Sequence, residues 1–329
     1  MLSYLKVMSG VAIAGFEQVL GELDEVETQL GRALDSEVPF VHGLGQFLQR
    51  AKGKRLRPAL AVLFYKLLGQ AGDRDALLKL ASVLELIHLA TLVHDDVIDC
   101  ASTRRDQATL HVHTSNRVAI LEGDYLFVRV FDAVNSYPQA TRDLIILTVK
   151  QILEGELLQE SLRGSVPSAQ QYFEVTQGKT AVLIAAACSL GAQWGNPRLA
   201  EEKRRSIHEA GMLMGQAFQL VDDLLDVFGD ERMGKPRWSD LRGGWLTLPL
   251  IRLVEQDNSY RAALLSGTLD GSLERRIQDG LLSLGVRAQI ENQAAHMLAQ
   301  AVENLSWLPA SRLRSTLFET IDFMAKRRN

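Results

Sequence analysis

The stretch FQLVDDLLDVFGD, residues 218–230, has the pattern of a helix with one acidic and one apolar side. At about 100° per residue, Asp222, Asp223 and Asp226 share one arc of about 100° with Gln219. The opposite half of the helix is apolar and holds Phe218, Leu220, Val221, Leu224, Leu225, Val227 and Phe228. The stretch therefore predicts a helix that buries one side in a core and lines up three carboxylates on the other.

A second acidic cluster with the same spacing lies earlier in the chain, in ELIHLATLVHDDVID, residues 85–99. Asp95, Asp96 and Asp99 share an arc with His88, and apolar residues such as Val93 point away from it. A single acidic cluster is more often a solvated helix face than a binding site. Two clusters with identical spacing favour the functional interpretation.

Both clusters offer only oxygen ligands, because His94 and Cys100 flank the first cluster but fall outside its arc. Crowded carboxylates repel one another unless a cation neutralises them. Oxygen ligands favour a hard ion such as Mg²⁺ over zinc, and Mg²⁺ commonly shares its coordination shell with substrate phosphates. The clusters therefore predict a diphosphate held through bridging Mg²⁺, for which Mn²⁺ could substitute.

The composition is that of an ordinary soluble globular protein. The 329 residues carry 36 basic and 40 acidic side chains, a formal net charge of −4, which argues against nucleic acid as the main partner. Only 8 residues are proline, and long Ala/Leu/Glu/Gln-rich stretches are typical of helices. We expect one all-α domain over residues 1–329, a helical bundle around a deep central cavity, with N-terminal helices in 1–35 packing on the body.

Glycine and proline mark the expected breaks between helices, near residues 35–39, 69–73, 136–138, 164–167, 191–197, 229–244 and 267–271. Residues 7–16 faintly resemble a signal peptide but run into an amphipathic helix pattern without a clear cleavage site. We expect no membrane span, since no stretch approaches about 18 apolar residues. The two cysteines, Cys100 and Cys188, indicate no disulfide framework, so we expect a cytoplasmic protein.

Six motifs occur in the order and with the separations typical of one enzyme family: KGKRLRP (52–58), ELIHLATLVHDDVID (85–99), the pair Arg104 and Arg105, GDYL (123–126), GKTA (178–181) and FQLVDDLLDVFGD (218–230). From about Phe40 to the C-terminus the chain resembles the trans-isoprenyl diphosphate synthases, of the medium- to long-chain type. The resemblance implies the all-helical isoprenoid synthase fold, usually as a homodimer. It also implies a prenyltransferase of isoprenoid biosynthesis that joins isopentenyl diphosphate to an allylic diphosphate.

The same resemblance implies roles for individual residues. Isopentenyl diphosphate would bind Lys54, Arg57, His88 and Arg105. The allylic diphosphate would bind Arg104, Lys179 and Lys235. Thr180 and Gln219 would orient the substrate or its ion. Catalysis would depend most on Asp95, Asp99, Asp222, Lys179 and Arg104. The departing diphosphate would take the final proton. Taken alone, the basic run is more often a solvated face, and His88 is more often a core or surface histidine.

Several positions depart from the family pattern. Trp245 follows Gly244 where a lysine is common, Trp238 replaces a usual glycine, Asp106 and Ala108 follow the arginine pair, and Lys52 replaces a glycine. Two alternatives therefore stay open: a non-catalytic or regulatory subunit of a heteromeric synthase, and, more distantly, a terpene cyclase.

Small residues one turn before Asp95 predict the length of the product. Ala90 and Thr91 would form the upper wall of the channel for the growing chain, where short-chain members carry aromatic rings. Because small residues one helical turn before Asp95 would leave this channel open, we expect an all-trans product of roughly six to ten isoprene units. Such a product would require transient membrane contact on release. A short-chain farnesyl or geranylgeranyl synthase is the alternative, because Ala90 could simply pack against a neighbouring helix.

Overall fold

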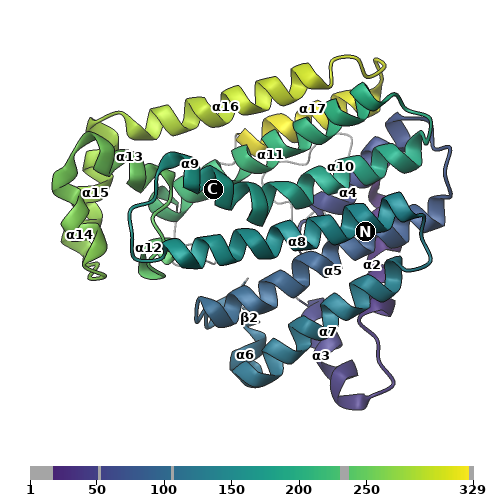
Figure 1. Cartoon of the computed structure of the whole chain (residues 1–329), viewed down its shortest axis with the longest axis horizontal. Helices are drawn as coiled ribbons and strands as arrows, with labels where there is room; N and C mark the ends of the chain where they lie inside the picture. Colours follow the sequence, from purple (N-terminus) through teal and green to yellow (C-terminus); the bar gives the residue numbers. More distant parts are fainter. Residues whose placement is uncertain (1–17, 51–52, 105–106, 230–236, 326–329) are drawn as a thin grey trace. The chain divides into compact units, whose positions relative to one another are not determined.

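The computed structural model describes residues 18–50, 53–104, 107–229 and 237–325, and these are predominantly helical (Figure 1). The prediction of an all-α fold is confirmed. The strands found among the described residues are a single short antiparallel pair, β1 (Thr103–Arg104) and β2 (Gln107–Ala108), in which Thr103 is opposite Ala108. Helices end or begin at each expected break, although one helix continues to Gly195 and a short helix lies within 229–244. The helical pattern is also interrupted at residues 284–285 and 305–311, where no break was expected.

The chain forms two compact units, each assembled from separate segments. The first contains residues 1–149, 186–208 and 307–320, and the second contains residues 150–185, 209–306 and 321–329. Four helices contribute residues to both: α8 (Gln139–Leu162), α10 (Val182–Gly195), α11 (Glu201–Phe228) and α17 (Arg312–Ala325). The single domain and its central cavity stay predictions.

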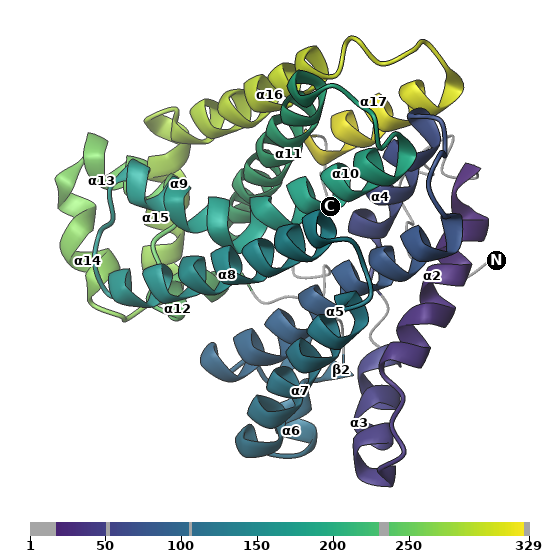
Figure 2. The same cartoon turned by 45° about the vertical axis from the view of Figure 1, so that its right-hand side comes forward.

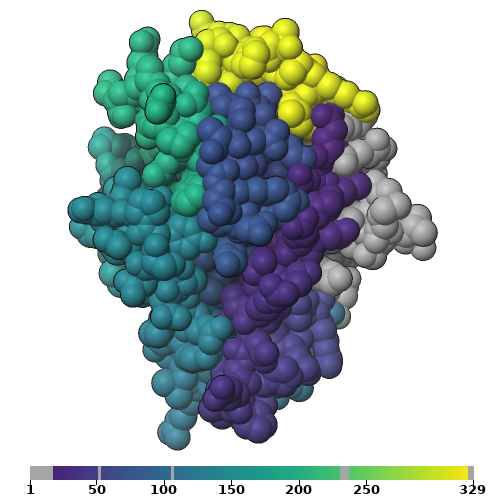
Figure 3. Space-filling view, turned by 90° about the vertical axis from the view of Figure 1, so that its right-hand side faces the viewer, coloured from purple at the N-terminus to yellow at the C-terminus, as the bar shows by residue number. Residues whose placement is uncertain are grey.

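In the first unit, the long helix α5 packs against several neighbours. The helices of this unit's N-terminal segment are α2 (Leu20–Ala33), α3 (Pro39–Arg50), α4 (Leu56–Leu67), α5 (Arg74–Ile98), α6 (Leu110–His113) and α7 (Asn116–Val134). Asp73 begins α5 by accepting a hydrogen bond from the backbone N–H of Ala76 at 2.9 Å, as N-cap residues do. Helices α2, α4 and α7 pack against α5. In Figure 3 the purple N-terminal helices run diagonally beside the blue segment that follows them in the chain. Figure 2 shows α3 lying near α6.

A close approach between α5 and α7 explains the glycine of the GDYL motif. Gly123 of α7 faces the ring of His94 on α5, and a β-carbon at this position would overlap the imidazole. The ring nitrogen Nε2 of His94 lies 3.1 Å from the carbonyl oxygen of Ile120. The glycine therefore allows α7 to lie directly against the end of α5 that carries the first acidic cluster.

The second unit is also helical. Its remaining elements are α9 (Ala169–Thr176), the π-helical turn η2 (Gln177–Ala181), α12 (Ser239–Arg242), α13 (Leu248–Gln256), the 3₁₀ turn η4 (Asn258–Tyr260), α14 (Arg261–Leu265), α15 (Gly271–Ser283) and α16 (Val286–Asn304). Helices α13, α15 and α16 pack on one another. Gly215 of α11 lies so close to Ala181 that no larger residue would fit. This contact brings η2 against the helix that carries the second acidic cluster.

Among the residues that the structure describes, two segments are long and apolar enough to cross a bilayer, namely α5 and residues 169–195. The expectation that no stretch approaches this length was therefore too strict. Most of each apolar window is buried inside the structure, with 67% buried in α5 and 72% in residues 169–195. Burial of this extent is typical of core helices, so composition alone does not make either segment a membrane span.

Candidate active site

The second acidic cluster turns its middle carboxylate inward. Asp223 is 1% exposed, whereas Asp222 and Asp226 on the same helix are half-buried. The hydroxyl of Tyr172 donates to Oδ2 of Asp223 at 2.5 Å, and Nε2 of Gln219 donates to Oδ1 at 2.8 Å. Burial and the neighbouring carboxylates of Asp240 and Asp222 raise the pKa of Asp223 well above its usual range, although the two hydrogen bonds oppose the shift.

Asp226 is held by the segment that follows the α11 helix. Its Oδ1 accepts hydrogen bonds from Oγ of Ser239 at 2.7 Å and from the backbone N–H of Ser239 at 3.0 Å. Its carbonyl oxygen accepts from the backbone N–H of Trp238 at 2.9 Å. One carboxylate oxygen of Asp226 therefore anchors the start of α12.

The π-helical turn η2 carries two predicted substrate ligands toward α11 and α8. Oγ1 of Thr180 donates to Oε1 of Gln219 at 2.9 Å, and Nζ of Lys179 pairs with Oε2 of Glu156 at 2.8 Å. Single π-helical turns inside helices are frequent at functional sites. Within this unit, the structure thus joins Thr180, Gln219 and Asp223 in one hydrogen-bonded network.

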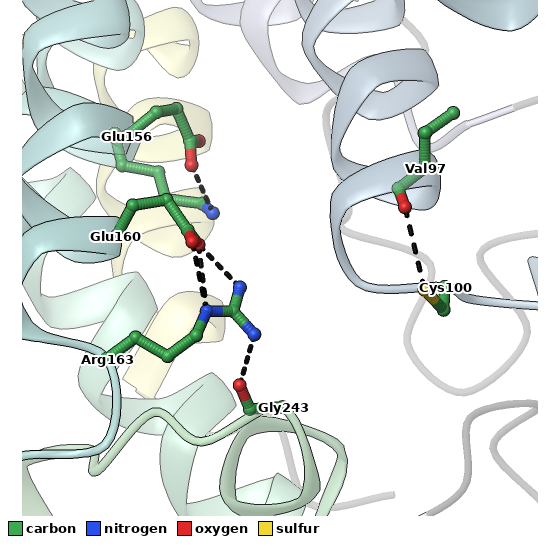
Figure 4. A network of polar contacts seen from close by, with 7 residues as sticks. Val97, Cys100, Glu156, Glu160, Arg163 and Gly243 are labelled. Carbon is green, nitrogen blue, oxygen red and sulfur yellow. Dashed lines mark hydrogen bonds and ion pairs between the residues drawn. The ribbon is translucent and has the colours of Figure 1, made fainter. Parts of the chain in front are cut away.

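The tryptophans that depart from the family pattern are both buried. Trp238 is 1% exposed and has φ +64°, a left-handed conformation that glycine adopts without strain, which explains why glycine is usual at this position. Trp245 is 8% exposed and follows a turn tied to the end of α8. Nη1 of Arg163 donates to the carbonyl of Gly243, and the same guanidinium pairs with Glu160, as Figure 4 shows.

The first acidic cluster also turns its middle carboxylate inward. Asp96 is 6% exposed, and its Oδ1 accepts a hydrogen bond from Nε of Arg104 at 2.7 Å and forms an ion pair with Nη2 of the same guanidinium at 2.7 Å. Burial raises the pKa of Asp96 even though Arg104 opposes the shift. Asp95 is half-buried, and Asp99 is exposed at the C-cap, since α5 ends at Ile98. Just beyond, the thiol of Cys100 lies 3.8 Å from the carbonyl of Val97 (Figure 4).

Among the described residues, the predicted isopentenyl site lies at the start of α4 and on α5: Lys54 is in the loop before α4, Arg57 is in its first turn, and His88 is on α5. Lys54 is exposed, while Arg57 and His88 are half-buried. Between Lys54 and Arg57, Arg55 is 7% exposed and pairs with Glu27 of α2 and Glu85 of α5. Sequence reasoning missed Arg55 and Tyr172. For Arg55, the one available signal was Glu85, an acidic residue in an otherwise apolar run.

The two proposed chain-length residues differ in burial. Ala90 is completely buried in the core, whereas Thr91 is half-buried and its Oγ1 donates to the carbonyl of His88 at 2.8 Å. The burial of Ala90 fits the alternative that it packs against a neighbouring helix. The predicted ligands Arg105 and Lys235, and the positions Lys52 and Asp106, lie outside the described residues.

The donor chemistry of both clusters fits Mg²⁺. Every carboxylate in them is a hard oxygen donor, and the accumulation of acidic charge around buried Asp223 is of the kind that a cation neutralises. In the described part of the chain, no three His, Cys, Asp or Glu side chains are already arranged around a metal position. This agrees with the inward orientation of Asp96 and Asp223, which turns one carboxylate of each cluster into the protein.

Comparisons with known proteins find relatives of this chain. The polyprenyl synthetase family model matches residues 39–278. The chain is 32% identical to the geranylgeranyl diphosphate synthase of Saccharolobus solfataricus, over 79% of this chain and 82% of that protein. It is 31% identical to heptaprenyl diphosphate synthase component 2 of Bacillus subtilis, over 93% and 88%. The structure of a polyprenyl synthase from Caulobacter crescentus, complexed with calcium and isoprenyl diphosphate, is similar with a TM-score of 0.88 and 31% identity, covering 95% of this chain and 97% of that one.

Proposed function

This chain belongs to the polyprenyl synthetase family and is a trans-prenyltransferase, and we propose which of its residues bind the metal, the isopentenyl diphosphate and the allylic diphosphate during their condensation. The observation that carries the proposal is the split within each acidic cluster. Asp96 and Asp223 are buried against protein partners, whereas Asp95, Asp99, Asp222 and Asp226 are half-buried or exposed. The four outer carboxylates are therefore the proposed metal ligands, and the two inner ones orient the site.

The ion that fits these ligands is Mg²⁺, with Mn²⁺ as a substitute. When bound, it would neutralise diphosphate charge and so favour ionisation of the allylic carbon–oxygen bond. Oδ1 of Asp226 is already held by Ser239, so its Oδ2 is the proposed donor. Calcium and isoprenyl diphosphate in the Caulobacter crescentus synthase support a divalent ion in this family.

The basic side chains bind the two diphosphates. Arg104 donates to Asp96 through Nε and forms an ion pair with it through Nη2, and Nη1 is the donor we assign to the allylic diphosphate. Lys179 carries three N–H donors, so its pair with Glu156 is compatible with a phosphate contact. Lys54, Arg57 and His88 are assigned to isopentenyl diphosphate, together with Arg105, and Lys235 to the allylic partner. The proton of the condensed cation leaves to the departing diphosphate.

The proposed product is a medium- to long-chain all-trans polyprenyl diphosphate of roughly six to ten isoprene units, whose chain would run past the residues one helical turn before Asp95. Thr91 is small and half-buried, so no aromatic ring blocks the channel at this position. The similarity to a heptaprenyl synthase component supports this length. The similarity to a geranylgeranyl synthase supports the shorter alternative.

We propose a homodimer that acts in the cytoplasm and contacts a membrane transiently when its product leaves. The faces of α7 and α8 expose large apolar side chains, including Leu121 (68%), Val128 (61%) and Leu157 (71%), which is unusual for a surface that stays in water. A heteromeric assembly is the alternative, supported by the name component 2 of one relative. Light scattering of the purified protein distinguishes the two, since a monomer would indicate that a different partner covers these residues.

A substrate-omission assay tests the proposed function. The purified protein is incubated in Mg²⁺ with isopentenyl diphosphate alone, with farnesyl diphosphate alone, and with both. We expect release of diphosphate and a longer prenyl chain only when both are present. Release from the allylic substrate alone would indicate a cyclase, and no product in any mixture would indicate a subunit that requires a partner.

A further inference from the structure

Arg55, which lies between Lys54 and Arg57, anchors the start of α4: Lys54 is in the preceding loop and Arg57 is in the first turn of the helix. Arg55 is 7% exposed although an unpaired arginine is costly to bury, and its backbone has φ +51°, a left-handed conformation uncommon for residues other than glycine. Lys54, its immediate neighbour, is exposed. The chain therefore turns one basic side chain inward between two that are more accessible.

The buried guanidinium joins two helices. Its Nε donates to the carboxylate of Glu27 on α2, and its Nη1 donates to Oε2 of Glu85 on α5 at 2.7 Å. Glu27 and Glu85 are themselves 12% and 3% exposed, so all three charges are largely withdrawn from water. The two carboxylates raise the pKa of Arg55 although burial opposes the shift. The planar fork of an arginine suits this arrangement, because a single ammonium group cannot present two separated donors in fixed directions.

The same contact sets the position of His88. Glu85 and His88 are three residues apart on α5, so they occupy neighbouring places on one face of the helix. Arg55, Glu85 and His88 also line one small cavity, together with Leu30, Leu48 and Leu89. The bond between Arg55 and Glu85 thus ties the segment that carries Lys54 and Arg57 to the helix that presents the histidine.

We propose that Arg55 is a positioning residue for isopentenyl diphosphate: it holds the left-handed turn in place so that Lys54 and Arg57 are presented together with His88. The inference rests on the proposed assignment of Lys54, Arg57 and His88 to that substrate. Binding energy from a diphosphate depends on the simultaneous reach of several cations, so a loosened loop weakens binding of this substrate more than of the other.

The test compares Arg55→Lys with Arg74→Lys. Arg74 also joins α5 to α2, through Glu25 at 2.5 Å, but it is 42% exposed and lies at the opposite end of α5 from the acidic cluster. For Arg55→Lys we expect the KM for isopentenyl diphosphate to rise by about tenfold or more, with the allylic KM changed by less than about twofold. Calorimetric titration with isopentenyl diphosphate alone should show the same loss of affinity. Arg74→Lys should change neither constant.

A second variant covers the case in which Arg55→Lys does not fold. Glu27→Gln removes the negative charge that α2 offers to Arg55 and keeps the pair between Arg55 and Glu85. It should therefore raise the KM for isopentenyl diphosphate by a smaller factor. The proposal is overturned if either folded variant changes both KM values equally, if neither changes the KM for isopentenyl diphosphate, or if both variants only unfold. Failure of the wild-type protein to condense the substrates would instead overturn the proposed function, whereas an active wild type with an unaffected Arg55→Lys would overturn only this inference.

Discussion

The hydroxyl of Tyr172 donates a hydrogen bond of 2.5 Å to the buried carboxylate of Asp223, joining α9 to the acidic helix α11. Burial, and after it the neighbouring carboxylate of Asp223, raises the pKa of Tyr172, so the phenol keeps its proton and remains the donor. The contact gives the middle member of the second acidic cluster a partner inside the protein. It therefore separates a structural carboxylate from the outer ones that we assign to the metal.

Removing this donor should destabilise the protein. Tyr172→Phe leaves the ring in place but deprives a buried carboxylate of one hydrogen bond, which costs about 1–3 kcal/mol in the free energy of unfolding. Urea denaturation measures the loss. Tyr125→Phe is the matched control, because its hydroxyl only accepts a 3.3 Å contact from Arg129 on the same helix. Equal stability of the two variants would show that the bond to Asp223 contributes little.

The outer carboxylates should determine metal dependence. We expect activity to require Mg²⁺ or Mn²⁺, and Asp95→Ala or Asp222→Ala to lower kcat by roughly two or more orders of magnitude through lost charge stabilisation. Asp143→Ala, which removes an exposed carboxylate on α8, should leave kcat unchanged. The assay is product formation with and without excess chelator. Full activity in chelator would contradict the proposed metal site.

The acidic face of α11 could be predicted from the sequence because helical spacing alone places Asp222, Asp223 and Asp226 together. The inward orientation of Asp223 could not, since an arc of about 100° includes both the buried edge and the exposed edge of a helix. Its partner Tyr172 is 51 residues away and comes from a different helix. The burial of Arg55 could not be predicted either, because a run of basic residues in the sequence does not show which side chain turns into the core.

Stability should depend on pH through Glu122, which is 4% exposed on α7. Burial raises its pKa from 4.5 to about 7. Below pH 4.5 the side chain is protonated in both the folded and unfolded states and its burial costs little. Between pH 4.5 and 7 only the unfolded state ionises, so stability falls as pH rises, and above pH 7 the loss is complete. Glu122→Gln should therefore add about 2 kcal/mol of stability at pH 8 and almost none at pH 4.5, as measured by urea denaturation at both values. A gain that does not change with pH would contradict a titrating Glu122.

Product length is best tested at Thr91, because the structure separates it from Ala90. Ala90 is completely buried, so Ala90→Phe would force a ring into a packed core and should destabilise the protein by about 1–3 kcal/mol or more without reporting on the channel. Thr91 is half-buried, lies one turn before Asp95, and loses only a bond to its own helix when replaced. If the growing chain runs past this position, Thr91→Phe should fold normally and give shorter alcohols than the wild type, as measured by chromatography after removal of the diphosphate.

Thr91→Val, which keeps the side chain small, should leave the product unchanged. Unaltered products from a folded Thr91→Phe would place the limit of chain growth on another helix, and farnesol as the only wild-type alcohol would contradict an open channel.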